Sequence, residues 1–363
     1  MTDTFELSRY TQQIKLAEIG VAGQEKLFQA RVLCVGAGGI SATLLPYLAG
    51  AGIGTIGIID DDSIEESNLH RQILYQEKDI KKSKATLAKL KLQALNSTIK
   101  ITAHECRLTA ENAQEIIRQY DLVADCSDNF YTRYLAHEIC YRLDKPYFYA
   151  SAYQFKGHCA LFYGKQNPCL QCIFPVIPPT VANCQNGAVL GTLPGLLGII
   201  QATEIIKWIT HAGISLLNRL LCIDLIPLEM KQVHLFKNEE CQFCIHGNPI
   251  EDKLLKRFHE TPEMHFHTVT SKDFFIFLEE NPKTLLLDVR TVAEHHQINL
   301  GGKLIPLDEL PDRLNELDSS RPHLIYCQSG QRSKQAYMIL KKAGFCSLYH
   351  LDHGIQSFEV TPT

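Results

Sequence analysis

Two pairs of cysteines in this sequence have the spacing of metal ligands. They are Cys169 with Cys172 and Cys241 with Cys244. A gap of two residues lets one turn point both sulfurs at one ion, and two such pairs supply the four thiolates of a tetrahedral structural zinc site. One pair alone would also suit a redox dithiol, whereas two pairs favour zinc. Because four thiolates are available, the neighbouring His246 is expected not to be a ligand.

A further cysteine, Cys327, follows a short apolar run and opens the stretch 327–333, after which a helix is predicted. A thiol at a strand end, surrounded by loop N–H groups and close to a helix N-terminus and Arg332, is expected to have a lowered pKa and to accept sulfur. A protein tyrosine phosphatase is the competing interpretation. Its loop has one residue more between cysteine and arginine, which makes room for phosphate, and here four residues separate Cys327 from Arg332. The shorter loop favours sulfur transfer.

A glycine-rich turn follows the apolar run 31–35 and precedes a predicted helix. The turn contains Gly36, Gly38 and Gly39. Free N–H groups at the start of a helix, together with the helix dipole, hold phosphates. At the tip of the next predicted strand, Asp60 suits a ribose hydroxyl. The dinucleotide fingerprint is imperfect, because Ser41 stands where its third glycine would be.

Nitrogen donors follow this turn and separate two kinds of nucleotide. They are Asn68, Arg71, Gln72 and Lys84. A nicotinamide site has little use for them, whereas a nucleotide triphosphate needs such donors for its negative charge. An NAD-dependent dehydrogenase is therefore a distant alternative. Asp62 belongs to the same acidic strand end as Asp60, and Asp128 follows a later strand, at the edge where ligands of parallel sheets bind.

Strands and helices are predicted to alternate around these residues. Strands are expected at 99–103 and 122–124, and helices over 5–30, 78–95 and 109–119. This rhythm predicts an α/β fold with a Rossmann-like, doubly wound and mostly parallel sheet.

Apart from Lys84, the lysines of 78–95 are expected to form a solvated face. Asp125 is expected to be structural. The remaining cysteines are expected mostly in the core: Cys34, Cys106, Cys126, Cys140, Cys159, Cys222 and Cys346.

Length and composition limit the remaining choices. At 363 residues the chain is too long for one ordinary core, and 45% hydrophobic with 21% charged residues describes a soluble globular protein. A net charge of −4 gives no support for a nucleic-acid surface, and the most apolar stretch, 187–200, is a poor membrane span. Because 1–9 contains no export signal, the thirteen cysteines are expected as metal, catalytic or buried thiols in the cytoplasm.

The character of the sequence changes after the last of the paired cysteines. We expect a nucleotide-binding domain over 1–247, a charged linker over 248–266 and a smaller α/β domain over 267–363. The second domain is indicated by apolar strands at 285–290 and 324–326. His295 and His296 have no metal spacing and are expected on the surface.

The first domain resembles the MoeB/ThiF (HesA/MoeB/ThiF) adenylyltransferases of the ubiquitin-activating superfamily. The matching residues are Arg9-Tyr10 with Gln13, the turn 36–39, Asp60 with Asp62, the stretch 67–72, Lys84, and the stretch 125–129. They come in family order and at family spacing, over about two thirds of the chain. The resemblance implies ATP as substrate, with Lys84 on its phosphates, Asp128 holding Mg²⁺ and Arg9 near the nucleotide.

The same resemblance implies roles for another cysteine and for a second subunit. Cys184 stands where the family has a thiol that attacks the acyl-adenylate or helps to form an acyl disulfide, the alternative being an unreactive loop thiol. The apolar stretch 189–206 would serve a homodimer contact. Gln12 stands where the family has an arginine that reaches the triphosphate across the dimer, so slow turnover is expected unless another cation substitutes.

The second domain resembles a rhodanese over about the last 95 residues. Rhodaneses often have arginine directly after the cysteine, and here Gln328 takes its place. A protein persulfide, for example on a cysteine desulfurase, is therefore expected as donor in preference to thiosulfate. Together the two resemblances imply ATP-dependent adenylylation of the C-terminal glycine of a ubiquitin-like sulfur carrier ending in Gly-Gly, of the MoaD or ThiS type. Sulfur transfer from Cys327 would then give a thiocarboxylate.

Two other classes of function stay open at this point. One is an activating enzyme in which the rhodanese unit only docks or regulates. The other is a noncatalytic scaffold, suggested by Gln12 and Gln328. The carrier itself would belong to molybdopterin, thiamine, tRNA-thiolation or related sulfur metabolism.

Overall fold

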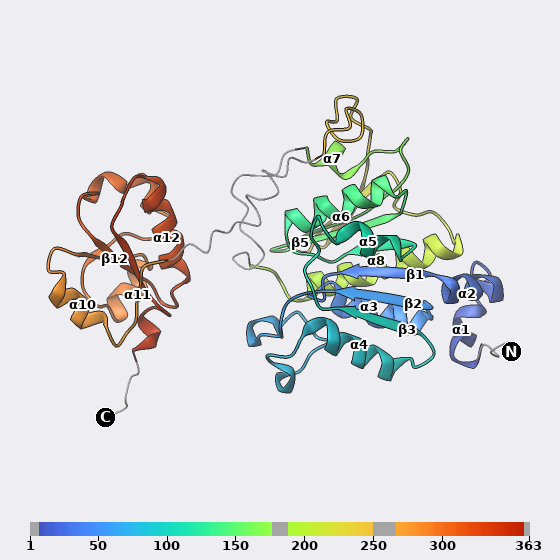
Figure 1. Ribbon diagram of the computed structural model, residues 1–363, viewed down its shortest axis with the longest axis horizontal. Helices are drawn as coiled ribbons and strands as arrows, with labels where there is room; N and C mark the ends of the chain where they lie inside the picture. Colours follow the sequence, from blue (N-terminus) through green and yellow to red (C-terminus); the bar gives the residue numbers. More distant parts are fainter. Residues whose placement is uncertain (1–6, 176–187, 250–265, 359–363) are drawn as a thin grey trace. The chain divides into compact units, whose positions relative to one another are not determined.

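The computed structural model describes residues 7–175, 188–249 and 266–358. The chain divides into two compact units, Met1–His259 and Glu260–Thr363 (Figure 1). Each unit has its own sheet and its own hydrophobic core. Residues 250–265 lie outside the described residues, so the borders of the linker expected over 248–266 stay a prediction.

An eight-stranded sheet in the order β3-β2-β1-β4-β5-β6-β7-β8 forms the centre of the first unit. Its strands are β1 (Arg31–Val35), β2 (Thr55–Ile59), β3 (Lys100–His104), β4 (Leu122–Asp125), β5 (Tyr147–Tyr153), β6 (Lys156–Phe162), β7 (Arg219–Asp224) and β8 (Glu229–His234). The first five strands pair in parallel, and β6, β7 and β8 form an antiparallel extension. The expected α/β fold with a mostly parallel, Rossmann-like sheet is confirmed.

Helices cover both faces of this sheet (Figure 1). They are α1 (Thr11–Ile14), α2 (Gly20–Gln29), α3 (Ser41–Ala51), α4 (Lys84–Leu95), α5 (Ala113–Arg118), α6 (Phe130–Arg142), α7 (Leu170–Ile173) and α8 (Thr192–Thr210), with 3₁₀ turns at Leu7–Tyr10, Glu66–Asn68 and Glu77–Asp79. Successive side chains of a strand point to opposite faces. Val32 and Cys34 therefore join the core under α3, α4 and α8, whereas Leu33 and Val35 join the core under α5 and α6.

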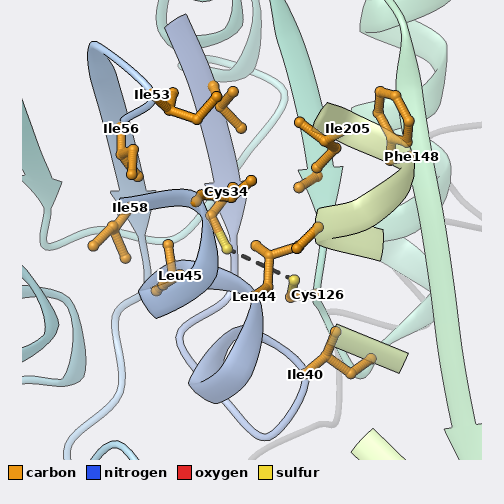
Figure 2. Packing of buried hydrophobic residues seen from close by; sticks show 14 of the residues in the cluster. Cys34, Ile40, Leu44, Leu45, Ile53, Ile56, Ile58, Cys126, Phe148 and Ile205 are labelled. Atoms are coloured by element: carbon orange, nitrogen blue, oxygen red, sulfur yellow. Dashed lines mark hydrogen bonds between the residues drawn. The ribbon is translucent and has the colours of Figure 1, made fainter. Parts of the chain in front are cut away.

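Buried cysteines fill small spaces in these cores. Four of the cysteines expected there are buried: Cys34, Cys126, Cys140 and Cys159. Cys34 on β1 and Cys126 just after β4 face one another with their sulfurs 3.6 Å apart (Figure 2). The expectation of a core position is wrong for Cys346, which is exposed, and only partly right for Cys106 and Cys222, which are half-buried.

Helices α3 and α8 pack closely beside the glycine turn. A Cβ added at Gly198 would lie 2.1 Å from the carbonyl oxygen of Ile40, so only glycine permits this approach. The Thr43 hydroxyl donates a hydrogen bond to the carbonyl oxygen of Gly195 at 2.7 Å. The two contacts hold the start of α3, and with it the glycine turn, against α8. In the described part of the chain, no helix has both the length and the apolar character needed to cross a membrane.

Two expected helices are shorter than predicted. The helix over 5–30 is interrupted between Ile14 and Gly20, where the backbone of Gly20 is left-handed with φ +58°. The basic helix over 78–95 begins only at Lys84. Lys81 is left-handed, with φ +70°, and Ser83 caps α4 by accepting a hydrogen bond from a first-turn N–H group.

One lysine of α4 departs from the expected solvated face. Lys91 is only 25% exposed and its ammonium lies 2.8 Å from Asp79 Oδ2. Lys82, which precedes the helix, pairs with the other oxygen of the same carboxylate at 3.1 Å. The hydrogen bond from Lys91 is the main reason that the pKa of Asp79 falls to about 2. These lysines therefore anchor α4 to the loop before it.

The second unit contains a five-stranded, fully parallel sheet in the order β11-β10-β12-β13-β9. Its strands are β9 (Thr268–Val269), β10 (Leu285–Asp288), β11 (Lys303–Leu304), β12 (His323–Tyr326) and β13 (Leu348–Leu351). Its helices are α10 (Phe274–Glu280), α11 (Val292–Gln297) and α12 (Gln331–Lys342), with 3₁₀ turns at Leu310–Asp312, Leu314–Glu316 and Ile355–Ser357. Cys327 follows the central strand directly, and the expected smaller α/β domain is confirmed.

Candidate functional site

The first candidate site lies where the order of the strands reverses. The chain runs from β1 through β2 to β3 on one side and then places β4 on the other side of β1. In open α/β sheets ligands bind at such a switch point, beyond the carboxyl ends of the strands. The glycine turn follows β1, and Asp128 follows β4. The fold therefore brings these two sequence-predicted features to the same end of the sheet, where the binding crevice of such folds lies.

The glycine turn requires its glycines for two different reasons. Gly36 has φ +95°, and a Cβ there would lie 2.9 Å from the carbonyl oxygen of Cys126. A Cβ at Gly39 would meet Pro194 of α8 at 3.0 Å. The backbone N–H of Ala37 donates to Asp60 Oδ2 at 2.6 Å, so part of this carboxylate holds the turn. Burial is the main reason that the pKa of Asp60 is raised.

Lys84 stands at the first position of α4 and is buried. Its ammonium lies 2.8 Å from Asp62 Oδ2. Tyr75, which the sequence analysis did not single out, donates its hydroxyl proton to the carbonyl oxygen of Ala37 at 2.8 Å and also lies 3.2 Å from the carbonyl oxygen of Lys84. Tyr75 thus fixes the glycine turn to the start of α4. No local signal marks it, because the contact joins residues far apart in the chain.

The amide side chains of Asn68 and Gln72 are buried with unused hydrogen-bonding capacity. Asn68 Oδ1 and Gln72 Oε1 have no partner among the described residues, and the missing side chain of Gly38 leaves Gln72 Nε2 close to the turn. A buried polar atom without a partner costs free energy, so these amides are groups that a ligand can satisfy. Arg71 is half-buried and donates to the carbonyl oxygen of Ser67 at 3.0 Å.

One expected nucleotide contact, Arg9, is not brought to this crevice within the chain. Arg9 donates to the carbonyl oxygen of Leu95, at the opposite end of α4 from Lys84. A helix of this length separates its ends by about 17 Å. A role for Arg9 at the nucleotide therefore stays a prediction that needs a second subunit. Cys184 lies outside the described residues.

The segment after β4 separates a structural carboxylate from an available one. Asp125 is fully buried, accepts hydrogen bonds from Ser127 and Tyr147 at 2.6 Å each, and lies 3.7 Å from Arg133. It is structural, as expected. Asp128 is exposed beside the crevice, just before Asn129, which caps α6. Asp128 is thus the carboxylate of this segment that is accessible to a metal bound with phosphates.

The four paired cysteines come together as the sequence predicted. One sulfur atom of each lies within 4.8 Å of the others, and three neighbouring pairs are 3.5 to 3.7 Å apart. A tetrahedron with Zn–S bonds of about 2.3 Å needs sulfurs about 3.8 Å apart. The cluster therefore fits zinc in donor type and in separation. His246 is exposed and does not belong to it.

Cys327 occupies a loop whose N–H groups converge on its sulfur. The backbone N–H groups of Gly330 and Ser333 donate to Cys327 Sγ at 3.2 and 3.3 Å, and Ser333 Oγ lies 3.7 Å from it. Gly330 is left-handed, with φ +87°, which turns the loop into α12. A Cβ at Gly354 would lie 2.4 Å from the carbonyl oxygen of Cys327. The sulfur is buried, and two backbone N–H groups are directed at it.

Arg332 does not direct its hydrogen bonds to the thiol. Both ends of its guanidinium are bound by Glu294, at 2.5 and 2.8 Å. This hydrogen bond is the main reason that the pKa of Glu294 falls to about 2. Glu294 was not predicted as a functional residue, although it forms with Thr291 a capping box at the start of α11 that is visible in the sequence.

A buried ion pair supports the other side of the loop. Arg290 and Asp288 are both fully buried and lie 2.8 Å apart. Burial opposes the charge of Asp288, but hydrogen bonds from Arg290 and His295 keep its pKa below its usual value. Arg290 also reaches Gln328 Oε1 at 3.4 Å. The expected surface position is only partly right for His295, which is half-buried and whose Nδ1 lies 2.9 Å from Asp288 Oδ2, whereas His296 is exposed.

Three features define the class of this protein: the glycine turn at the switch point, the cluster of four thiols and the cysteine surrounded by N–H groups. They describe a protein with one unit suited to binding a nucleotide and a second unit suited to carrying sulfur. The ThiF family model matches residues 10–243, and the rhodanese-like domain model matches residues 277–361. The chain belongs to the ThiF family and carries a rhodanese-like domain after the family's domain.

Relatives with the same two activities in their names span nearly the whole chain. A protein of Mycobacterium tuberculosis, the probable adenylyltransferase/sulfurtransferase MoeZ, is 36% identical over 96% of this chain and 92% of its own length. The adenylyltransferase and sulfurtransferase MOCS3 of Danio rerio is 34% identical over 93% of this chain and 80% of its own. The sulfur carrier protein adenylyltransferase of Thermus thermophilus is 42% identical over 66% of this chain and 91% of its own.

Solved structures resemble the larger part of the chain in fold. E. coli MccB matches with a TM-score of 0.59 and 22% identity over 67% of this chain and 76% of that chain. PaaA matches with a TM-score of 0.55 and 20% identity, over 66% of this chain and 78% of that one. At these identities the likeness supports the fold alone.

Proposed function

We propose that this protein uses ATP to adenylylate the C-terminal glycine of a small ubiquitin-like sulfur carrier and then transfers sulfur from Cys327 to the activated carboxyl group. The observation that carries the proposal is the combination, in one chain, of an anion-binding turn at a switch point and a cysteine sulfur cradled by N–H groups. The names of the relatives that span almost the whole chain support both steps.

In the first step, a carboxylate oxygen of the carrier attacks the α-phosphorus of ATP, and the bond to pyrophosphate breaks. The residues at the crevice act by positioning and by neutralising charge. The turn from Gly36 to Gly39 would face the phosphates, and Lys84 and Arg71 would bind them. Asn68 and Gln72 would accept hydrogen bonds from N–H or O–H groups of the nucleotide through their unpartnered amide oxygens. Asp60 would use its remaining acceptor capacity on the ribose. Mg²⁺ held by Asp128 would neutralise further phosphate charge.

In the second step, the outer sulfur of a Cys327 persulfide attacks the acyl carbon and AMP leaves. The product is an acyl disulfide between the carrier and Cys327. A second thiol must then cleave the sulfur–sulfur bond to release the thiocarboxylate, and Cys184 is our candidate. The resulting disulfide between Cys184 and Cys327 is reduced by a cellular dithiol. Arg332, whose positive charge is balanced by Glu294, would hold the loop after Cys327 in position.

Zinc on Cys169, Cys172, Cys241 and Cys244 would be structural, because four thiolates leave no open position for a substrate. Burial is the main reason that the pKa of Cys244 rises to about 12, so without a cation its thiol keeps its proton. A bound divalent ion would replace that proton and join two distant segments of the first unit.

We further propose that the protein acts as a homodimer in the cytoplasm. Leu190 and Ile199, both in the apolar stretch 189–206 expected at a subunit contact, are each 40% exposed in the single chain, which is compatible with such a contact. Arg9 would then act on the partner's nucleotide. The expected sulfur donor is a protein persulfide such as that of a cysteine desulfurase, since Gln328 and the neutralised Arg332 offer little attraction for a free anion.

The test combines two assays on the purified full chain with a carrier protein that ends in Gly-Gly. ATP–pyrophosphate exchange that depends on the carrier measures the first step. Mass spectrometry of the carrier measures the second, as the replacement of one oxygen by sulfur in the presence of a persulfide donor. Cys327→Ala should abolish the mass shift and leave exchange intact. Absence of carrier-dependent exchange would refute the proposal.

A rhodanese unit that only docks or regulates is the alternative that these assays separate. In that case Cys327→Ala would leave thiocarboxylate formation unchanged. A noncatalytic scaffold would show neither exchange nor the mass shift with any carrier.

A further inference from the structure

His137 lies in helix α6 against the cluster of four cysteines, and none of the chemistry proposed above uses it. It is 1% exposed. Its Nε2 accepts a hydrogen bond from the backbone N–H of Leu170 at 3.1 Å. Leu170 follows Cys169 directly and is the first residue of α7. The side chain of His137 therefore binds the backbone of the first Cys-x-x-Cys segment.

The N–H group of Leu170, which donates to His137, is one that the short helix α7 leaves without a partner. The first N–H groups of a helix have no intrahelical acceptor. Cys169 occupies the N-cap position of α7 and makes no capping hydrogen bond with its side chain, as expected for a sulfur that faces the other three. His137 supplies the missing acceptor from outside, so Cys169 is left to bind a metal.

The imidazole ring also contacts the second Cys-x-x-Cys segment. Phe243 lies between Cys241 and Cys244, and its ring packs edge-on against His137 with centroids 5.8 Å apart. Tyr147 and Phe162 close the other sides of the ring, at 5.4 and 5.8 Å. One side chain thus touches both segments that carry the cysteines, although the segments are 72 positions apart.

The hydrogen-bonding pattern fixes the form of the imidazole. An Nε2 that accepts a hydrogen bond is unprotonated, so the neutral ring carries its proton on Nδ1. Nδ1 is buried and has no hydrogen-bond partner among the described residues. A buried donor without a partner costs free energy. A phenylalanine would fill the same aromatic box without that cost. What histidine adds at this position is therefore the acceptor nitrogen.

We propose that His137 is a positioning residue for the four-cysteine metal site. It holds the N–H of Leu170 and thereby directs the sulfurs of Cys169 and Cys172 toward those of the second pair before the ion arrives. Groups that orient metal ligands typically change metal affinity about 10- to 100-fold. The proposal rests on the zinc site and not on the proposed reaction.

The acceptor is tested by measuring zinc content and the rate of zinc release to a chromogenic chelator, on the full chain. His137→Phe keeps the aromatic packing and removes the acceptor, and it should release zinc about 10- to 100-fold faster than the wild type. His137→Gln can place an amide oxygen near the former Nε2 and should restore slow release. Tyr141→Phe is the comparison on the second cysteine pair, since it removes the long hydrogen bond, 3.5 Å, that the Tyr141 hydroxyl donates to the carbonyl oxygen of Cys244.

The donor of this hydrogen bond, the backbone N–H of Leu170, is tested separately. Leu170→Pro deletes the N–H at a first helical position that proline tolerates, and the extended backbone of Cys169 suits a residue before proline. Leu170→Ala controls for the lost side chain. Leu170→Pro should release zinc faster than Leu170→Ala, and adding His137→Phe should cause no further increase.

Several outcomes would overturn the proposal. They are wild-type release rates in His137→Phe, equal rates in Leu170→Pro and Leu170→Ala, and fully additive effects of the two changes. Purified wild-type protein without zinc would also overturn it, whatever the outcome of the ATP–pyrophosphate exchange. If His137→Phe does not fold, the comparison of the two Leu170 variants decides.

Discussion

The ammonium of Lys84 lies 2.8 Å from the carboxylate of Asp62, and the two partners differ sharply in exposure. The side chain of Lys84 is 7% exposed and that of Asp62 is 56% exposed. A cation so deeply buried needs a counter-charge. Asp62 provides it from the solvent side of the crevice, and a bound triphosphate would provide a stronger one.

Loss of the lysine charge should therefore impair the adenylylation step far more than loss of its partner. We expect Lys84→Met to lower carrier-dependent ATP–pyrophosphate exchange about 10²- to 10³-fold, as for removal of one preorganised charge stabiliser. Asp62→Asn should lower exchange by about tenfold or less, because an exposed partner contributes little. Lys89→Met, on the same helix, is the control. Exchange at the wild-type rate in Lys84→Met would exclude the assigned role.

The glycine turn should not tolerate a side chain at its first position. Gly36→Ala places a Cβ 2.9 Å from a backbone oxygen at φ +95°, and we expect it to lower the free energy of unfolding of the first unit by about 2 kcal/mol or more. ATP affinity should fall with it. Gly50→Ala meets nothing within 4 Å and lies in α3, so it should be neutral or stabilising by up to about 1 kcal/mol. Chemical denaturation and nucleotide titration measure both effects, and equal stability of the two variants would contradict the expectation.

The ion pair between Glu294 and Arg332 should make the second unit sensitive to acid. The pKa of Glu294 falls from 4.5 to about 2 on folding. The unfolded state therefore binds the proton first as the pH drops. The stabilisation is complete above about pH 4.5 and is lost as the pH falls toward 2. Because both side chains are partly exposed, we expect it to amount to roughly 1 kcal/mol.

Glu294→Gln should remove this pH dependence. Thermal unfolding of the wild type and the variant, followed between pH 6 and pH 3, should give curves that converge at the acid end. Glu316→Gln is a useful comparison, because Glu316 pairs with Arg313 away from the cysteine loop. Curves that stay parallel down to pH 3 would show that the pair does not contribute.

Removal of the metal should destabilise the first unit and leave the second unchanged. Cys241→Ser replaces one thiolate of the cluster, and a chelator should then strip zinc from the variant at concentrations that spare the wild type. Calorimetry should show a lower unfolding temperature for the first unit and an unchanged unfolding temperature for the second. Cys346→Ser, at an exposed thiol of the second unit, should behave as the wild type. Resistance of the wild-type transition to complete metal removal would contradict a structural role.

Features set by short segments of sequence were predictable. The glycine turn, the paired cysteines and the loop of Cys327 each depend on spacing within a few residues, and each appears where expected. The rhythm of apolar segments likewise predicted a parallel sheet, because strands buried on both faces lack polar alternation.

Features set by contacts between distant residues were not predictable. Tyr75 and His137 have no local signature, since each acts on a residue that only folding brings near. The capping box of Glu294 is a local signature, but it gives no sign of the ion pair with Arg332. The surface position predicted for His295 was only partly right for the same reason. The absence of metal spacing said nothing about a buried carboxylate, Asp288, at the end of a neighbouring strand.

The wide separation of the two cysteine pairs has a consequence for how the chain is made. Synthesis runs from the N-terminus, so a nascent chain that ends before Cys244 lacks a complete set of ligands. All four sulfurs could bind one zinc ion only when this last thiol has left the ribosome. Completion of the metal site in the first unit would thus coincide with the start of translation of the second unit, and a first unit truncated before Cys244 would lack a complete set of ligands.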